Sequence, residues 1–136
     1  DLSLSMIDVG RAAEYHHHAL SRGLTAERQQ HFFDSIDDNN WRVISDVRQR
    51  LRFQSLNLMD SFAALGKFEV VFCRNVLIYF SLKLKINILR RIHAALRPGG
   101  YLILGASEGL ADAKQHLKMV QCSPGIIYQA LLKLLS

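Results

Sequence analysis

The sequence predicts an α/β fold. Two short apolar segments at 68–73 and 101–105, rich in β-branched and aromatic residues, are typical of buried strands. Between them, residues 81–96 repeat apolar side chains at helical spacing. This order predicts a parallel βαβ unit with a right-handed crossover. The length of 136 residues, with 49% hydrophobic and 21% charged residues, suits one globular domain and excludes a mainly disordered chain.

The first half of the chain predicts two helices and then two strands. Ser3 is a suitable N-cap, and Gly23 suits the left-handed end of a helix. After a turn rich in Asp and Asn, apolar and polar residues alternate, as in half-buried strands. The predicted segments are a helix at 3–20, a short helix at 25–33, a turn at 34–40, a strand at 41–47 and a strand at 50–54.

The second half predicts the sheet and its covering helix. The helix follows Ser81, a possible cap, and Pro98-Gly99-Gly100 ends it. Its apolar stripe consists of Leu84, Ile88, Leu89, Ile92 and Leu96. The other predicted segments are a loop and short helix at 57–66, a weak helix at 110–116, and an antiparallel pair of strands at 118–122 and 125–132.

Composition narrows the function classes. No window approaches the roughly 18 apolar residues of a membrane span, so no membrane insertion is expected. Two cysteines, Cys73 and Cys122, cannot form a disulfide scaffold, which favours a reducing, cytoplasmic compartment. The net charge of +5 comes from scattered basic residues, which argues against nucleic acid as a partner. Three adjacent histidines, 16–18, cannot all face one ion, and no metal site is expected.

Polar residues follow the first buried strand directly, where ligands bind in open α/β sheets. Arg74 and Asn75 come after Cys73, and Tyr79 lies a few residues on. The second strand ends at Gly105 and further small residues, which let a ligand approach closely. In a generic α/β protein these positions would be a surface charge, a turn former, a half-buried anchor and a tight turn. Cys73 beside Arg74 could be a reactive thiolate, although a buried packing residue is favoured.

Motifs for other chemistry are absent from the sequence. It contains no G-x-G-x-x-G or P-loop phosphate cradle, no H-E-x-x-H zinc motif and no G-x-S-x-G nucleophile elbow.

The string Phe-Cys-Arg-Asn-Val-Leu-Ile-Tyr-Phe at 72–80 closely resembles the chemotaxis receptor methyltransferase (CheR) family. Further segments agree in order: 1–15, Ser-Leu-Asn-Leu at 55–58, Leu-Arg-Pro-Gly-Gly at 96–100, Gly-Ala-Ser-Glu at 105–108 and Ile-Tyr at 127–128. The resemblance implies a Rossmann-like S-adenosylmethionine-dependent methyltransferase fold. It also implies that residues 1–136 are a partial catalytic domain, incomplete at the N-terminus, with a small antiparallel β subdomain inserted at 32–54.

The same resemblance implies a reaction and its residues. Members transfer a methyl group from S-adenosylmethionine to receptor glutamates and release S-adenosylhomocysteine. The cofactor-binding residues would be Asp1 at the ribose, Asn57 and Leu58 beside the adenine, and Asn75 near the methionine end. The catalytic residues would be Arg74, which orients the substrate glutamate, and Tyr79, whose hydroxyl lies close to the methyl group.

Two departures from the family pattern shape the expected partners. The family's N-terminal helical domain, first strand and glycine-containing cofactor loop have no counterpart here, so the chain looks like a fragment that binds cofactor poorly. Strand 68–73 would then present an open edge, which a second copy could cover by pairing or swapping, or a missing segment of the same chain could. The turn at 34–40 is short and lacks glycine, which implies binding to chemoreceptor cytoplasmic helices without docking on a receptor's C-terminal pentapeptide.

Two other functions stay open on the sequence alone. One is a non-catalytic module of the same fold that binds receptors or other chemosensory partners. The other is a methyltransferase that acts on a small molecule or on nucleic acid.

Overall fold

A computed structural model describes residues 2–110, 115–122 and 125–131 of the chain. It forms two compact units, 1–57 and 58–136, and each is described by itself. None of the described helices is both long and apolar enough to cross a membrane.

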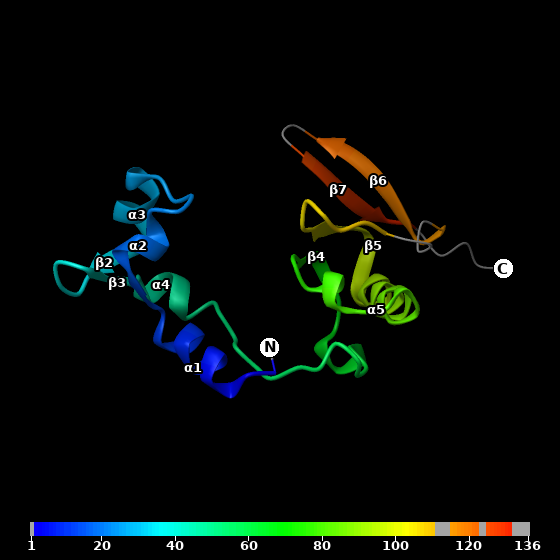
Figure 1. Ribbon diagram of the computed structural model, residues 1–136, viewed down its shortest axis with the longest axis horizontal. Helices are drawn as coiled ribbons and strands as arrows, with labels where there is room; N and C mark the ends of the chain where they lie inside the picture. The colour runs from blue at the N-terminus through cyan, green and yellow to red at the C-terminus, as the bar shows by residue number, and fades with distance from the viewer. Residues whose placement is uncertain (1, 111–114, 123–124, 132–136) are drawn as a thin grey trace. The chain divides into compact units, whose positions relative to one another are not determined.

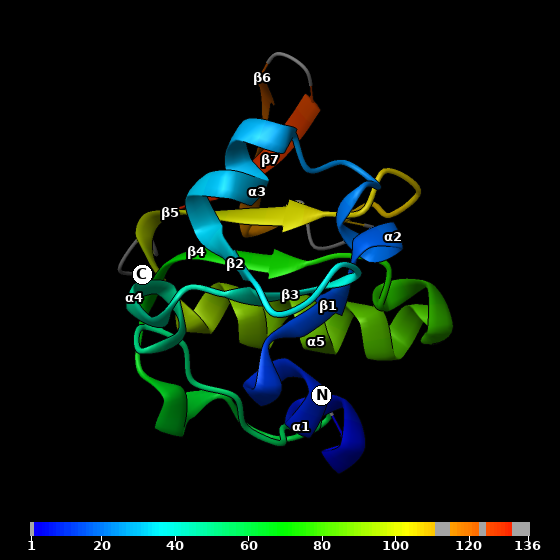
Figure 2. The same ribbon diagram turned by 90° about the vertical axis from the view of Figure 1, so that its left-hand side faces the viewer.

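The first unit is built on a small antiparallel sheet with strand order β1-β3-β2, which faces the viewer in Figure 2. Helices precede and follow these strands along the chain. In order, the elements are α1 (Leu4–Ala12), β1 (Glu14–His16), α2 (His17–Leu20), α3 (Ala26–Phe32), β2 (Phe33–Ser35), β3 (Asn40–Val43) and α4 (Ser45–Arg48). A predicted antiparallel sheet in this part of the chain is therefore present, but its strands differ from those expected.

The continuous helix predicted at 3–20 is wrong, because a strand interrupts it. The N-cap is confirmed, since the Met6 amide donates to Ser3 Oγ at 3.3 Å. The helix ends at Ala13, which has a left-handed φ of 54°, and the next three residues form β1. Pairing with β3, reinforced by an ion pair between Glu14 and Arg42, outweighs the local helical pattern.

The strand predicted at 41–47 ends early, and the strand predicted at 50–54 is wrong. β3 stops at Val43, and residues 45–48 turn into α4, with Asp46 in its first turn and Arg48 in its last. That charge order suits the helix dipole. The short helix predicted at 25–33 is confirmed as α3, and Thr25 Oγ1 accepts from the Arg28 amide at 3.3 Å.

The second unit contains a four-stranded mixed sheet with order β4-β5-β7-β6 (Figure 1). β4 and β5 are parallel, and the remaining pairs are antiparallel. The elements are two 3₁₀ turns, η1 (Ala63–Leu65) and η2 (Leu77–Tyr79), with β4 (Phe68–Cys73), α5 (Leu82–Ala95), β5 (Leu96–Leu104), β6 (Leu117–Cys122) and β7 (Gly125–Ala130). The predicted α/β class, the βαβ unit and the C-terminal antiparallel pair are confirmed.

The core of this unit lies between α5 and the sheet. Ile88, Leu89 and Ile92 are buried as the stripe predicted, and Leu102 of β5 is fully buried. Ser81 takes the N-cap position but makes no side-chain hydrogen bond there. Leu96 is also buried, but it begins β5 instead of ending the helix.

β4 lies at one edge of the sheet among the described strands. Its side chains Val70 and Phe72 are 44% and 70% exposed, so burial on both faces of this strand, as predicted, is wrong. An open apolar edge agrees with what the resemblance implied. The weak helix predicted at 110–116 falls mainly on residues 111–114, outside the described residues.

Candidate functional site

The parallel strands β4 and β5 end side by side. Their register pairs Cys73 with Leu104, so Arg74 and Gly105 begin the two loops that leave the same edge of the sheet. This is the place where open α/β sheets bind ligands. The polar segment predicted from the sequence therefore lies at the expected end of the sheet.

A single buried carboxylate, Glu108, ties these two strand ends together. One oxygen, Oε2, accepts from the amides of Asn75 at 2.7 Å and Gly105 at 2.8 Å. The other, Oε1, accepts from Val76 at 3.0 Å and Leu77 at 2.7 Å. Three successive amides that converge on one anion form a nest, with the fourth donor, Gly105, coming from the loop after β5.

The four amides decide the charge of Glu108. Burial, which leaves this residue only 7% exposed, by itself raises the pKa of the carboxyl. Hydrogen bonds from Gly105, Asn75, Leu77 and Val76 favour the ionised form more strongly, and the pKa is lowered overall. Glu108 is therefore a carboxylate at neutral pH, and backbone dipoles alone balance its charge among the described residues.

The conformation of the loop after β4 depends on two small features. Asn75 has a left-handed φ of 58°, which asparagine tolerates better than most residues. Its side-chain oxygen packs over Gly105, where a Cβ would overlap Asn75 Oδ1 and lie 2.7 Å from Glu108 Oε2. Gly105 is needed because the two loops approach too closely for any side chain.

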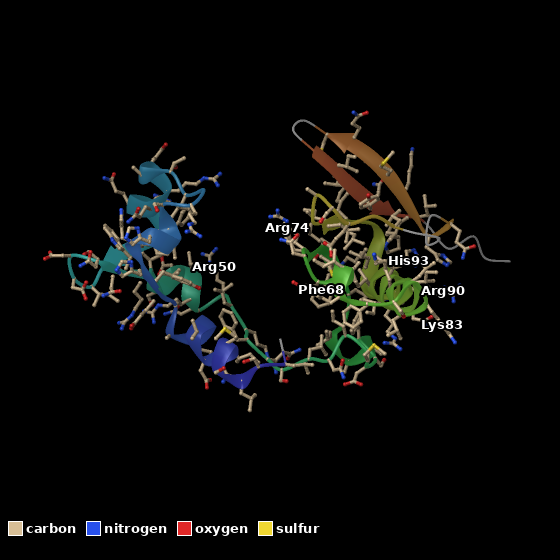
Figure 3. All side chains as sticks on the ribbon, viewed as in Figure 1. Arg50, Phe68, Arg74, Lys83, Arg90 and His93 are labelled. Carbon is tan, nitrogen blue, oxygen red and sulfur yellow. The ribbon has the colours of Figure 1, made fainter. Side chains whose placement is uncertain are left out.

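The two residues predicted to be catalytic flank this anchored turn. Arg74 is exposed and extends from the end of β4 (Figure 3), and Tyr79 is 82% exposed. Neither side chain makes a hydrogen bond or an ion pair within the described residues. Between them, Leu77 is fully buried and fixes the segment to the core. The backbone is held while both side chains predicted to be catalytic are exposed.

Cys73 is a packing residue. The thiol is 7% exposed, and burial together with the nearby charge of Glu108 raises its pKa to about 11. A thiolate favoured by Arg74, the alternative considered from the sequence, is therefore excluded at neutral pH.

The other predicted cofactor residues lie apart from this segment in the sequence. Leu58 belongs to the second unit, where its carbonyl accepts from Arg91 of α5 at 3.0 Å, and Arg91 also donates to the Met59 carbonyl. Asn57 ends the first unit, and Asp1 lies outside the described residues. The structure thus groups Arg74, Asn75 and Tyr79 in one segment, and the grouping with Asp1, Asn57 and Leu58 remains a prediction.

Sequence reasoning did not assign a role to Glu108. A usable signal was present, because Glu108 follows the small residues that end the second buried strand. A carboxylate in such a position can accept from backbone amides of the neighbouring loop. Which amides it meets depends on the pairing of two strands about thirty residues apart, which local patterns do not specify.

Comparison with known proteins identifies the class and the family. The fold and the segment at its strand ends are those of a Rossmann-like, S-adenosylmethionine-binding methyltransferase domain. Residues 1–126 match the family model described as CheR methyltransferase, SAM binding domain, and the chain belongs to this family. The resemblance seen at 72–80 is thereby confirmed.

Curated relatives agree with this assignment. The chain is 56% identical to "Chemotaxis protein methyltransferase 1" of Pseudomonas aeruginosa and 55% identical to "Chemotaxis protein methyltransferase Cher2" of Pseudomonas putida, each over 96% of this chain and 47% of the relative. It is 48% identical to "Chemotaxis protein methyltransferase 1" of Vibrio cholerae, over 95% of this chain and 47% of that protein. The chain therefore spans about half the length of these relatives.

S-adenosylmethionine is the cofactor that this family binds, and the residues at the strand ends suit part of it. The exposed ring of Tyr79 offers a π face for a sulfonium cation. The exposed residues Asn75 and Arg74 offer an amide and a guanidinium for the amino acid end or for a substrate carboxylate.

Proposed function

We propose that the protein carrying this chain transfers a methyl group from S-adenosylmethionine to glutamate side chains of chemoreceptors. The observation that supports this most directly is the segment from Arg74 to Tyr79, held at the carboxyl ends of β4 and β5 in a chain of the CheR family. The printed names of the relatives point to methylation in chemotaxis, and the glutamate substrate is our proposal.

The reaction needs alignment more than it needs an acid or a base. S-adenosylmethionine supplies an electrophilic methyl group when bound. A glutamate carboxylate is already ionised at pH 7 and attacks without losing a proton. Its oxygen forms an O–C bond as the C–S bond breaks and the bonding pair moves to sulfur, which leaves a methyl ester and S-adenosylhomocysteine. Catalysis of this kind depends on holding the three atoms in line.

The protein's residues would supply that alignment. The guanidinium of Arg74 can bind a carboxylate through two parallel N–H···O bonds and so direct one oxygen toward the methyl group. The ring of Tyr79 can cover the methyl group and exclude water, which matters because charge is neutralised during the reaction. Both side chains are free to do this because neither has a partner among the described residues.

We propose chemoreceptor cytoplasmic helices as the partner. Residues 58–136 contain ten Lys or Arg against four Asp or Glu, whereas residues 1–57 contain seven against eight. The unit that carries Arg74 and Tyr79 is therefore the positive one, and a positive field speeds association with a partner rich in glutamate. Added salt should therefore slow the association of the protein with its receptor.

We further propose that this partner is bound without its C-terminal pentapeptide. The turn between β2 and β3 is short and has no glycine, and the Asp37 carboxylate closes it by accepting from the amides of Asn39 and Asn40, both at 2.8 Å. Titration of a receptor tail peptide into the protein should give no saturable binding. Tight binding would overturn this part of the proposal.

The reaction is tested with the intact gene product, methyl-labelled S-adenosylmethionine and a chemoreceptor cytoplasmic fragment. We expect label in the receptor that base releases as methanol, and none when the accepting glutamates are replaced by alanine. A stable methylated amine would contradict the ester chemistry. Binding of S-adenosylmethionine by calorimetry without any transfer would instead favour a non-catalytic receptor-binding module.

A further inference from the structure

We infer that Glu108 is a positioning residue for methyl transfer: its ionised carboxylate sets the backbone from which Arg74 and Tyr79 reach the reacting atoms. This inference rests on the proposed function. The inference goes beyond that function by giving a role to a residue whose carboxylate accepts hydrogen bonds from backbone amides.

The loop after β4 is held largely by a residue outside it. The loop after β4 leaves the sheet at an edge strand, and no strand neighbours it on that side among the described residues. The amides of residues 75, 76 and 77 all donate to Glu108, which lies more than thirty residues along the chain. The orientation of this loop therefore depends on Glu108, from the loop that follows β5, together with the buried side chain of Leu77.

Arg74 and Tyr79 lie on either side of residues 75–77, the anchored stretch. Arg74 immediately precedes it and Tyr79 follows it by two residues. Because neither side chain makes a hydrogen bond or an ion pair in the described part of the chain, the backbone fixes the points from which they start. Displacing the Asn75 turn would move both starting points together.

The hydrogen bonds to Glu108 suit a carboxylate and no other side-chain group of the same size. Each carboxylate oxygen accepts two N–H donors, so the site requires acceptors on both branches of the side chain. Glutamine has the same shape but presents an NH₂ group on one branch, which would face two N–H groups. Aspartate keeps the charge and both acceptors but is shorter by one methylene. Glu108→Gln therefore tests the need for two acceptor oxygens, and Glu108→Asp tests the need for the full length of the side chain.

The experiment compares steady-state methyl transfer by the wild-type gene product, Glu108→Gln and Glu108→Asp. Each variant is first shown to be folded at the assay temperature by circular dichroism. Misplacement by about 1 Å lowers the rate by roughly 100-fold, so we expect kcat to fall about 10- to 100-fold in Glu108→Gln, with a smaller change in KM for the receptor. Glu108→Asp should recover part of that loss.

Two kinds of control, for packing and for charge, exclude a merely structural role of Glu108. Leu89→Ala and Ile92→Val weaken buried packing on α5 without touching the loop, and their thermal midpoints should bracket that of Glu108→Gln. They should keep kcat within roughly twofold of wild type, since α5 lies outside the aligned groups. Glu69→Gln removes an exposed carboxylate on β4, paired with Arg97 at 2.7 Å, and serves as the charge control.

A second measurement does not require activity. Amide hydrogen exchange at 75–77 and 105 should accelerate in Glu108→Gln beyond any change at Leu102, while Leu89→Ala should change these amides no more than Leu102. Equal kcat and equal exchange in Glu108→Gln and wild type would overturn the inference, as would an equal loss of kcat in Leu89→Ala. An inactive wild type would refute the proposed function instead, and the exchange result would still decide whether Glu108 sets the loop.

Discussion

Two carboxylates organise turns in this protein, Asp37 in the first unit and Glu108 in the second, and they do so in contrasting ways. Asp37 is exposed and accepts from amides two and three residues ahead of it. Glu108 is buried and accepts from amides in a different loop, more than thirty residues away. The Asp37 carboxylate closes a local turn, whereas the Glu108 carboxylate joins the loops that follow two paired strands.

The pKa of both carboxyl groups is lowered, but for different reasons. The pKa of Asp37 is lowered chiefly by the side chain of Asn40, with the Asn39 amide next. The pKa of Glu108 is lowered although burial opposes it, because several amides act together. The two carboxylates nevertheless differ in structural importance: water can replace the exposed partners of Asp37, whereas the amides bound to Glu108 are buried or partly buried.

The largest expected difference between the two is in stability. Glu108→Ala should lower the free energy of unfolding by about 3–5 kcal/mol, because four buried or partly buried amides lose a charged acceptor at once. Asp37→Ala removes acceptors from amides that water can reach, and its effect should be far smaller. Urea denaturation of both variants measures this, and comparable losses would contradict the distinction.

The next effect comes from the close approach that Glu108 enforces. Gly105→Ala would place a Cβ against Asn75 Oδ1 and 2.7 Å from Glu108 Oε2, and it should destabilise the fold by about 1–3 kcal/mol. Gly109→Ala is the matched control, since a Cβ there meets nothing within 4 Å in the described part of the chain. A Gly105→Ala variant as stable as Gly109→Ala would show that the two loops can separate freely.

The parts of this arrangement that could be predicted are the local ones. The strand 68–73, the helix that buries Ile88 and Leu89, and the Asn-rich turn follow from periodicity and turn chemistry. The failures were non-local. Glu14–His16 became a strand because β3 pairs with it, and residues 50–54 did not, because no described strand pairs with them. Glu108 belongs with these failures, since three of its four partners, the amides of residues 75–77, come within reach only once β4 and β5 have paired.

A smaller effect should appear in the pH dependence of stability. The folded pKa of Glu108 is below its ordinary value of 4.5, so the unfolded chain binds more protons in the acid range. The contribution of ionised Glu108 to the free energy of unfolding is therefore complete well above pH 4.5. It is lost as the pH falls through the pKa of Glu108 in the folded state. The difference in unfolding free energy between wild type and Glu108→Gln should shrink over that range, with Glu69→Gln as control. A difference that stays constant from neutral to acid pH would contradict an ionised anchor.

The smallest effect is expected at Asp37. Asp37→Asn keeps one side-chain acceptor for the Asn39 and Asn40 amides and loses the charge, so the thermal midpoint should change little. Because the contacts are local, amide exchange should accelerate only near 37–40 and leave β1 unchanged, although β1 pairs with the strand that begins at Asn40. Loosening that spreads to residues 14–16 would mean that this exposed carboxylate supports its whole sheet, and the contrast with Glu108 would then be one of degree.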